Sequence, residues 1–142
     1  MHTNDKPLQR SLVLPNDVNE VPQLAAFIDG VCEQLGVDMA TAMQLNLALE
    51  EAVVNVMTYA YPAGTKGYAD IRVEVDDKRM TIVITDTGIP FDPTAKADVD
   101  TTLSLEQRSI GGLGIHLVKT IMDDVSYQRL DGQNVLTLRK NL

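Results

Sequence analysis

The spacing of the apolar residues changes along this chain, and that change limits the folds open to it. Apolar side chains recur at a helical spacing of three or four residues between residues 21 and 60, and then alternate with polar ones between residues 69 and 84. The first pattern is typical of amphipathic helices and the second of half-buried strands. Helices and hairpins that follow one another in blocks indicate an α+β fold, with the helices on one face of a mainly antiparallel sheet.

The breaks between these patterns predict the individual elements. We expect a strand over residues 8–14, helices over 22–35, 38–60 and 111–122, and hairpins over 69–84 and 125–140. Pro22 suits the first turn of a helix, Gly36 ends that helix, and Asp38 can cap the next one. The second helix is apolar on more than one side, with Leu45 on one flank and Met43 on another, so we expect it to be packed on both flanks.

Composition narrows the classes of function. The chain has 142 residues, enough for one domain, and a net charge of −8. An acidic chain is a poor match for nucleic acid or for an anionic membrane surface, since both attract clustered Lys and Arg. No apolar run approaches the ~18 residues of a membrane span, and the N-terminus lacks the pattern of a signal peptide. Cys32 is the only cysteine, so the cytosol is the expected compartment.

Glu51 and Asn55 stand four residues apart in the second expected helix, so their side chains lie on one face of it. A carboxylate and a carboxamide that point the same way can orient a water molecule and bind a hard cation through oxygen. A solvated polar stripe has the same spacing, and the pair alone is consistent with both interpretations. Apolar neighbours place one of the two near the core, whereas Glu50 faces elsewhere and is expected in solvent.

Asp86 and Gly88 follow an alternating run, so Asp86 is expected at the end of a strand. A carboxylate there can accept a hydrogen bond from an exocyclic amine, and a glycine two residues later admits a flat ring against the backbone. An ordinary Asp-x-Gly turn has the same residues and is the commoner case. The segment from Asp86 to Ser109 is polar and interrupted by glycine and proline, which is typical of a lid or binding loop.

A glycine-rich segment opens the third expected helix, and its residues are Gly111, Gly112, Leu113, Gly114 and Ile115. Glycines let successive N–H groups converge on an anion, and a helix N-terminus favours negative charge. The segment follows a polar loop rather than a strand, and it lacks Gly-Lys-Ser/Thr. It is therefore neither a dinucleotide-binding motif nor a P-loop. A flexible helix start is the alternative. Arg108, three residues earlier, could contact a terminal phosphate or lie in solvent.

Taken together, the order and spacing of these segments resemble the GHKL, or Bergerat-fold, ATPases, which include gyrase-type ATPases, Hsp90, MutL and histidine kinases. The segments that carry the resemblance are 49–55 (LEEAVVN), 86–93 (DTGIPFDP) and 111–118 (GGLGIHLV). They are most similar to the anti-sigma-factor serine kinases of the RsbW and SpoIIAB type. Pro90 fits this branch better than the histidine kinases, whereas Asn134 stands near where many relatives have Gly-Thr.

The resemblance implies a fold, a set of roles and cofactors. The fold is a two-layer α/β sandwich with a mainly antiparallel, mixed sheet, in one domain over residues 1–142 with a lid at about 94–110. Glu51 corresponds to the general base, Asn55 to the Mg²⁺ ligand and Asp86 to the residue that binds the adenine amine. Gly88 lines the adenine ring, and the glycine-rich segment binds the phosphates of ATP or ADP.

The resemblance also implies partners. Proteins of this branch phosphorylate a serine on a STAS-type antagonist and sequester a sigma factor, and they commonly form homodimers. We therefore expect a cytoplasmic, ATP-dependent serine kinase that is also an anti-sigma factor, with no direct contact to nucleic acid or membrane. The alternative is a non-catalytic, nucleotide-gated binding module. A third hypothesis is an ATPase domain that acts with a separate phosphotransfer protein.

Overall fold

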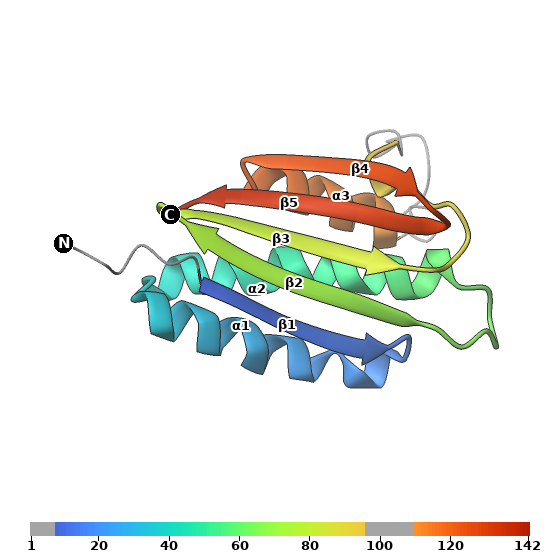
Figure 1. Ribbon diagram of the computed structural model, residues 1–142, viewed down its shortest axis with the longest axis horizontal. Helices are drawn as coiled ribbons and strands as arrows, with labels where there is room; N and C mark the ends of the chain where they lie inside the picture. Colours follow the sequence, from blue (N-terminus) through green and yellow to red (C-terminus); the bar gives the residue numbers. More distant parts are fainter. Residues whose placement is uncertain (1–7, 96–109) are drawn as a thin grey trace.

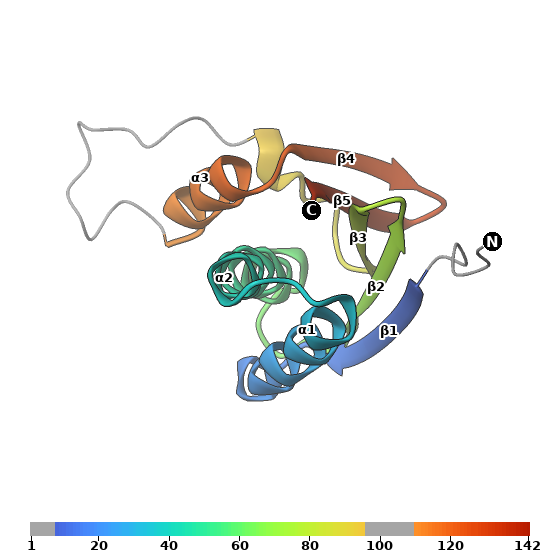
Figure 2. The ribbon, with the colours of Figure 1, turned by 90° about the vertical axis from the view of Figure 1, so that its left-hand side faces the viewer.

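A five-stranded sheet carries three α-helices on one of its faces in the computed structural model, which describes residues 8–95 and 110–142 (Figure 2). The strands are β1 (Leu8–Pro15), β2 (Tyr68–Asp76), β3 (Arg79–Asp86), β4 (Asp124–Leu130) and β5 (Gln133–Asn141). The helices are α1 (Pro22–Leu35), α2 (Met39–Asn55) and α3 (Ile110–Ile121). Three short helical turns are η1 (Val18–Glu20), η2 (Val56–Ala60) and η3 (Pro93–Ala95).

The strands lie in the order β1-β2-β3-β5-β4, and each neighbouring pair is antiparallel (Figure 1). Two-residue turns connect β2 to β3 and β4 to β5, and all four of their residues have positive φ: Asp77, Lys78, Asp131 and Gly132. Such turns match the twist of an antiparallel pair. The expected two-layer α+β fold is confirmed. The parallel pair that a mixed sheet requires is not found among the described strands, since all four neighbouring pairs are antiparallel.

The sequence signals for the helix ends are also confirmed. Pro22 is the first residue of α1, and Gly36 ends that helix at φ 69°, a conformation that glycine adopts without steric cost. Asp38 stands at the N-cap of α2, although its side chain makes no capping hydrogen bond. The second helix reaches residue 60 as expected, but its last turn, η2, is a π-helix. Within residues 8–95 and 110–142, no helix has the length and hydropathy needed to cross a bilayer.

The core lies between the helices and the inner face of the sheet, and almost all of it is aliphatic. The strands contribute Ile71, Val73, Met80, Ile82, Ile84, Leu136 and Leu138, and the helices contribute Leu24, Ile28, Leu45, Leu49, Val53 and Val118. Burying a large aliphatic side chain contributes roughly 1.5–3 kcal/mol to folding. This layer therefore holds the ends of β3, α2 and α3 in place.

One expectation about α2 is wrong. Leu45 and Leu49 are fully buried, but the opposite flank is exposed rather than packed: Met43 is 66% and Leu47 43% accessible to solvent. The periodicity identified the residues that share a face correctly. It carried no information on whether another element covers that face, and α1 and α3 lie beside α2 rather than over it (Figure 2).

Candidate active site

Three of the sequence-predicted segments meet at one end of the molecule. The C-terminal end of α2, the C-terminal end of β3 and the N-terminal end of α3 all lie at the right-hand side of Figure 1. They bring Glu51 and Asn55, Asp86 and Gly88, and the glycine-rich segment to the same end of the fold. The backbone amide of Ile89 donates to the carbonyl of Ala60 at 2.8 Å, which joins the loop after β3 to the π turn after α2.

Glu51 lies on α2 with its side chain partly buried, whereas the neighbouring Glu50 is exposed, as expected. Burial raises the pKa of the Glu51 carboxyl, and the negative charge of Glu50 raises it further. A carboxylate with a raised pKa holds a proton more firmly than an ordinary glutamate does. The raised pKa makes Glu51 a stronger base than an ordinary glutamate, which is a property that general-base catalysis uses.

Asn55 is the last residue of α2 and is only 2% exposed. Its Nδ2 donates to the carbonyl of Glu51 at 2.9 Å, whereas its Oδ1 is buried and has no hydrogen-bond partner. A buried amide oxygen without a partner is costly, and oxygen is the ligand that Mg²⁺ prefers. Asn55 Oδ1 therefore has the chemistry and the burial of a Mg²⁺ ligand. In the described part of the chain, no cluster of three or more His, Cys, Asp or Glu side chains could hold a metal.

Gly88 is required by close packing against the π turn. A Cβ atom at this position would lie 2.2 Å from the carbonyl oxygen of Ala60 and 2.9 Å from the Ala60 Cβ. The ring of Phe91, three residues later, lies 5.4 Å from that of Tyr59. The glycine thus lets the loop after β3 pack directly against η2. The sequence did not indicate this reason for a glycine at position 88.

Asp86 is the last residue of β3 and is 1% exposed. Its Oδ1 accepts hydrogen bonds from the Gly88 amide and from Asn134 Nδ2, both at 2.8 Å. Burial raises the pKa of this carboxyl, while these two hydrogen bonds and the charge of Arg129 oppose the rise. Neither hydrogen bond uses Oδ2, so this oxygen can accept a hydrogen bond from a ligand.

Asn134 fixes the surroundings of Asp86 through four hydrogen bonds, and sequence reasoning did not assign it this role. It lies on β5 directly opposite Asp86 in the strand register and is 2% exposed. Its Nδ2 also donates to the Ile89 carbonyl at 2.8 Å. Its Oδ1 accepts from the Phe91 amide at 3.1 Å and from the Tyr127 hydroxyl at 2.6 Å. One side chain therefore positions both the carboxylate and the loop that follows it.

The glycine-rich segment lies at the start of α3. Gly111 and Gly112 belong to the first turn, where backbone N–H groups have no partner within the helix and can bind an anion. Gly114 is the fifth residue of the helix and lies beyond that set. The side chain of Ile115, which the sequence also placed in this segment, is buried in the core. Arg108 and most of the expected lid, residues 96–109, lie outside the described residues.

Comparison with known proteins identifies the family. A family model described as a histidine kinase-like ATPase domain matches residues 14–140. The chain belongs to this family. A serine-protein kinase RsbW from Halalkalibacterium halodurans is 30% identical over 96% of this chain and 85% of its own length. A serine-protein kinase RsbW from Bacillus velezensis is 29% identical over 86% of this chain and 79% of its own length.

Solved structures agree on the fold of this ATPase domain. The histidine kinase domain of a blue-light activated histidine kinase from Erythrobacter litoralis matches with a TM-score of 0.54 and 16% sequence identity. The match covers 91% of this chain and 62% of that one.

Two further residues support the site of this ATPase domain and had no signal in the sequence. The Tyr61 hydroxyl accepts from the Thr87 amide at 3.0 Å and donates to the Tyr68 carbonyl at 2.7 Å. Arg129 on β4 donates to the Gly88 carbonyl at 2.8 Å. The contacts of Tyr61 with Thr87 and of Arg129 with Gly88 join residues that are distant in the chain, so local patterns could not have indicated them.

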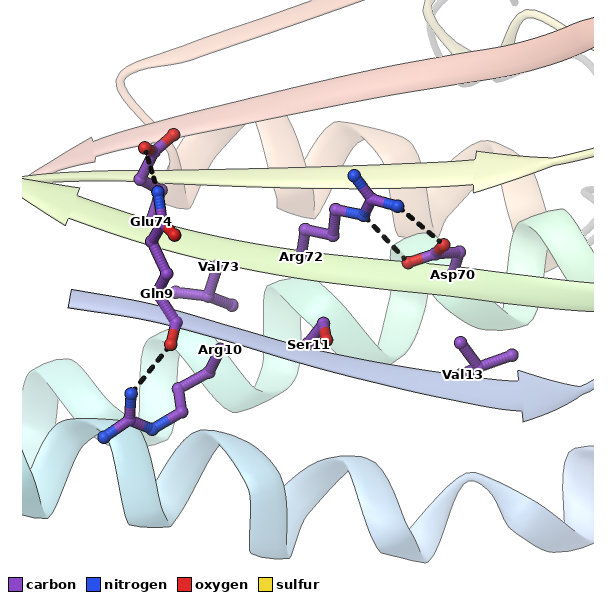
Figure 3. Close-up of a pocket in the computed structure, with 8 residues that line it drawn as sticks. All are labelled: Gln9, Arg10, Ser11, Val13, Asp70, Arg72, Val73 and Glu74. Atoms are coloured by element: carbon purple, nitrogen blue, oxygen red, sulfur yellow. Dashed lines mark hydrogen bonds and ion pairs between the residues drawn. The ribbon is translucent and has the colours of Figure 1, made fainter. Parts of the chain in front are cut away.

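A separate hollow of about 750 Å³ lies away from this site, on the outer face of β1 and β2 (Figure 3). Its charged residues pair with their neighbours. Arg72 Nε lies 3.4 Å from Asp70 Oδ1, and Gln9 Nε2 donates to Glu74 Oε1 at 2.9 Å. Asp70 Oδ1 is buried and, although it lies within ion-pair distance of Arg72, it accepts no hydrogen bond.

Proposed function

We propose that this protein is an ATP-dependent serine kinase and anti-sigma regulatory factor that phosphorylates a STAS-type antagonist. The observation that carries the proposal is the buried, unpartnered Oδ1 of Asn55, one helical turn from the partly buried carboxylate of Glu51. The two RsbW serine-protein kinases reported above, similar over most of the chain, support it.

In the proposed reaction, Glu51 removes the proton from the substrate serine hydroxyl. The serine Oγ forms a bond to the γ-phosphorus of ATP, the bond from that phosphorus to the β,γ-bridging oxygen breaks, and ADP leaves. Asn55 would hold Mg²⁺ through Oδ1, and the ion would neutralise charge on the phosphates. Phosphoryl transfer needs mainly positioning and charge neutralisation from the protein, and a positioned base typically contributes about 10²–10⁴-fold.

The same proposal assigns the nucleotide contacts. Asp86 Oδ2 would accept a hydrogen bond from the adenine amine, while Gly88 N and Asn134 Nδ2 hold Oδ1 in place. The free amides in the first turn of α3 would bind phosphate oxygens. In this proposal residues 1–142 form one cytoplasmic ATP-binding domain with a lid at about 94–110, and a sigma factor is the second partner.

A phosphorylation assay tests the function. The full chain, a candidate STAS-domain protein, Mg²⁺ and γ-labelled ATP are incubated together. Glu51→Gln is the variant, and Glu33→Gln, which changes an exposed glutamate on α1, is the matched control. We expect acid-stable label on a serine, and at least about a 100-fold loss of transfer in Glu51→Gln with ADP affinity unchanged. Transfer at the wild-type rate in Glu51→Gln would overturn the base assignment. Partner binding that depends on ATP without any transfer would favour the non-catalytic binding module instead.

A further inference from the structure

Helix α2 exposes a row of large apolar side chains on the flank opposite the core. Met39 is 79%, Met43 66% and Leu47 43% accessible to solvent. They stand at positions i, i+4 and i+8, so they form one line along the helix, called here the α2 stripe. The same helix buries Leu45 and Leu49 on its other side. An exposed row of large apolar side chains is a candidate interaction surface.

The charges of α2 and α1, the helix that carries the α2 stripe and its neighbour on one side, have a single sign. Residues 11–65, which include α1 and α2, contain no Lys or Arg and seven acidic residues. Asp29 of α1 lies beside the stripe, because its Oδ1 accepts a hydrogen bond from Asn46 on α2 at 2.8 Å. Glu50 is exposed and lies three residues after Leu47, on the same flank of the helix. The apolar line is therefore bordered by carboxylates and by no cation of the helices that carry it.

This charge pattern selects among the possible occupants. A second copy that used the same face would bring like charges together, and an anionic membrane would be repelled. The segments outside the described residues are not basic: residues 96–109 hold two basic and three acidic residues, and residues 1–7 hold one of each. Methionine side chains are flexible and polarisable, and they adapt to helical ligands laid across them. A helix with an apolar row flanked by Lys and Arg would match the α2 stripe in both hydrophobicity and charge.

We propose that the α2 stripe is the docking surface for a basic amphipathic helix of a protein partner. Apolar residues of that helix pack on Met39, Met43 and Leu47, and its cations face Asp29 and Glu50. The surface lies on the helix flank rather than at the end of the fold that holds the candidate nucleotide site. It does not depend on the proposed kinase activity.

Methyl NMR on the full chain tests where such a helix binds. The probe is a peptide of about 18 residues, five helical turns, with Leu in a helical stripe and Lys elsewhere. A peptide of the same composition with scrambled order is the comparison. We expect the methyl signals of Met39 and Met43 to shift on addition of the amphipathic peptide, while those of the buried Met57, Met80 and Met122 do not. Equal shifts with the scrambled peptide would overturn the proposal, since they would show attraction by charge alone.

Variants test the energetic role of the α2 stripe. Met43→Gln combined with Leu47→Gln should weaken binding of the amphipathic peptide at least about tenfold in fluorescence anisotropy. Val13→Gln combined with Val18→Gln changes two side chains that are 58% and 55% exposed on other elements, and it should leave the affinity unchanged. An equal loss in both double variants would overturn the proposal. So would sedimentation showing a dimer that Met43→Gln and Leu47→Gln convert to a monomer, because a second copy would then be the occupant.

Discussion

Replacing the carboxylate of Asp86 by an amide separates the proposed adenine-binding role of this residue from its structural one. In Asp86→Asn, Oδ1 can still accept from Gly88 N and from Asn134 Nδ2, both now at 2.8 Å. The free Oδ2 becomes an NH₂ group, a donor that would face the adenine amine, another donor. Losing a hydrogen bond to a charged group costs about 1.5–3 kcal/mol, and the facing donors add to this cost. We therefore expect the affinity for ADP to fall at least about 100-fold.

The same substitution should not destabilise the fold at neutral pH. The pKa of Asp86 is raised in the folded chain, chiefly by burial, above its ordinary value of 3.8. The folded chain therefore binds the proton more tightly than the unfolded chain does. Wild-type protein should lose stability relative to Asp86→Asn as the pH rises from that ordinary value through the folded-state pKa. Above this window the variant should be at least as stable as the wild type.

Two measurements test whether Asp86 binds the adenine amine and whether burial of its charge lowers the stability of the fold. Calorimetry with Mg²⁺ and ADP measures the affinity, and urea unfolding followed by circular dichroism at about pH 4, 6 and 8 measures the stability. Asp76→Asn changes an exposed carboxylate on β2 and serves as the matched control for both. An ADP affinity within about threefold of wild type, under 1 kcal/mol, would refute the adenine assignment. A variant less stable than wild type at pH 8 would refute the argument that burial of the charge is costly.

Three further predictions follow from other contacts of the site. Gly88→Ala places a methyl group 2.2 Å from the Ala60 carbonyl oxygen and should lower the free energy of urea unfolding by about 1–3 kcal/mol. Unchanged stability would contradict the close approach of residue 88 to the Ala60 carbonyl oxygen. Tyr61→Phe removes three hydrogen bonds of one buried hydroxyl and should cost about 2–4 kcal/mol in that assay. A loss of stability below about 1 kcal/mol would contradict the structural importance of these three hydrogen bonds. Burial and then Glu50 raise the pKa of Glu51, so Glu50→Gln should move the acid limb of the kinase pH–rate profile to lower pH. An unchanged acid limb would mean that the pKa of a group other than Glu51 determines its position.

The elements could be predicted from the sequence because their signals are local. Pro22 at the first position of α1 and Gly36 just after its end act through their own backbone preferences. The alternation of apolar and polar residues in β2 and β3 reflects a sheet with one buried face and one solvent-exposed face. The burial of one member of the Glu51 and Asn55 pair was also expected, since apolar residues flank the pair, and the structure shows that Asn55 is the buried one.

The remaining features depend on which distant residues meet. Asn134 contacts Asp86 because the register of β5 against β3 places them opposite each other, and no local pattern encodes that register. The π turn at 56–60 has no distinctive residues, yet it presents the Ala60 carbonyl to Ile89. The exposure of Met43 was missed for a related reason, since periodicity shows which residues share a face and not what covers it.

The position of Asn134 in the chain also bears on when the protein can first hold a nucleotide. The amide that orients Asp86 is made 48 residues later, and Arg129 comes from the same β4–β5 hairpin. A growing chain that has emerged only as far as α3 already contains the carboxylate and the glycines, but it lacks the donors that position them. Chains fold from the N-terminus during synthesis, and ligands stabilise only the states that bind them. Nucleotide would therefore stabilise only those chains whose β4–β5 hairpin has already paired with β3.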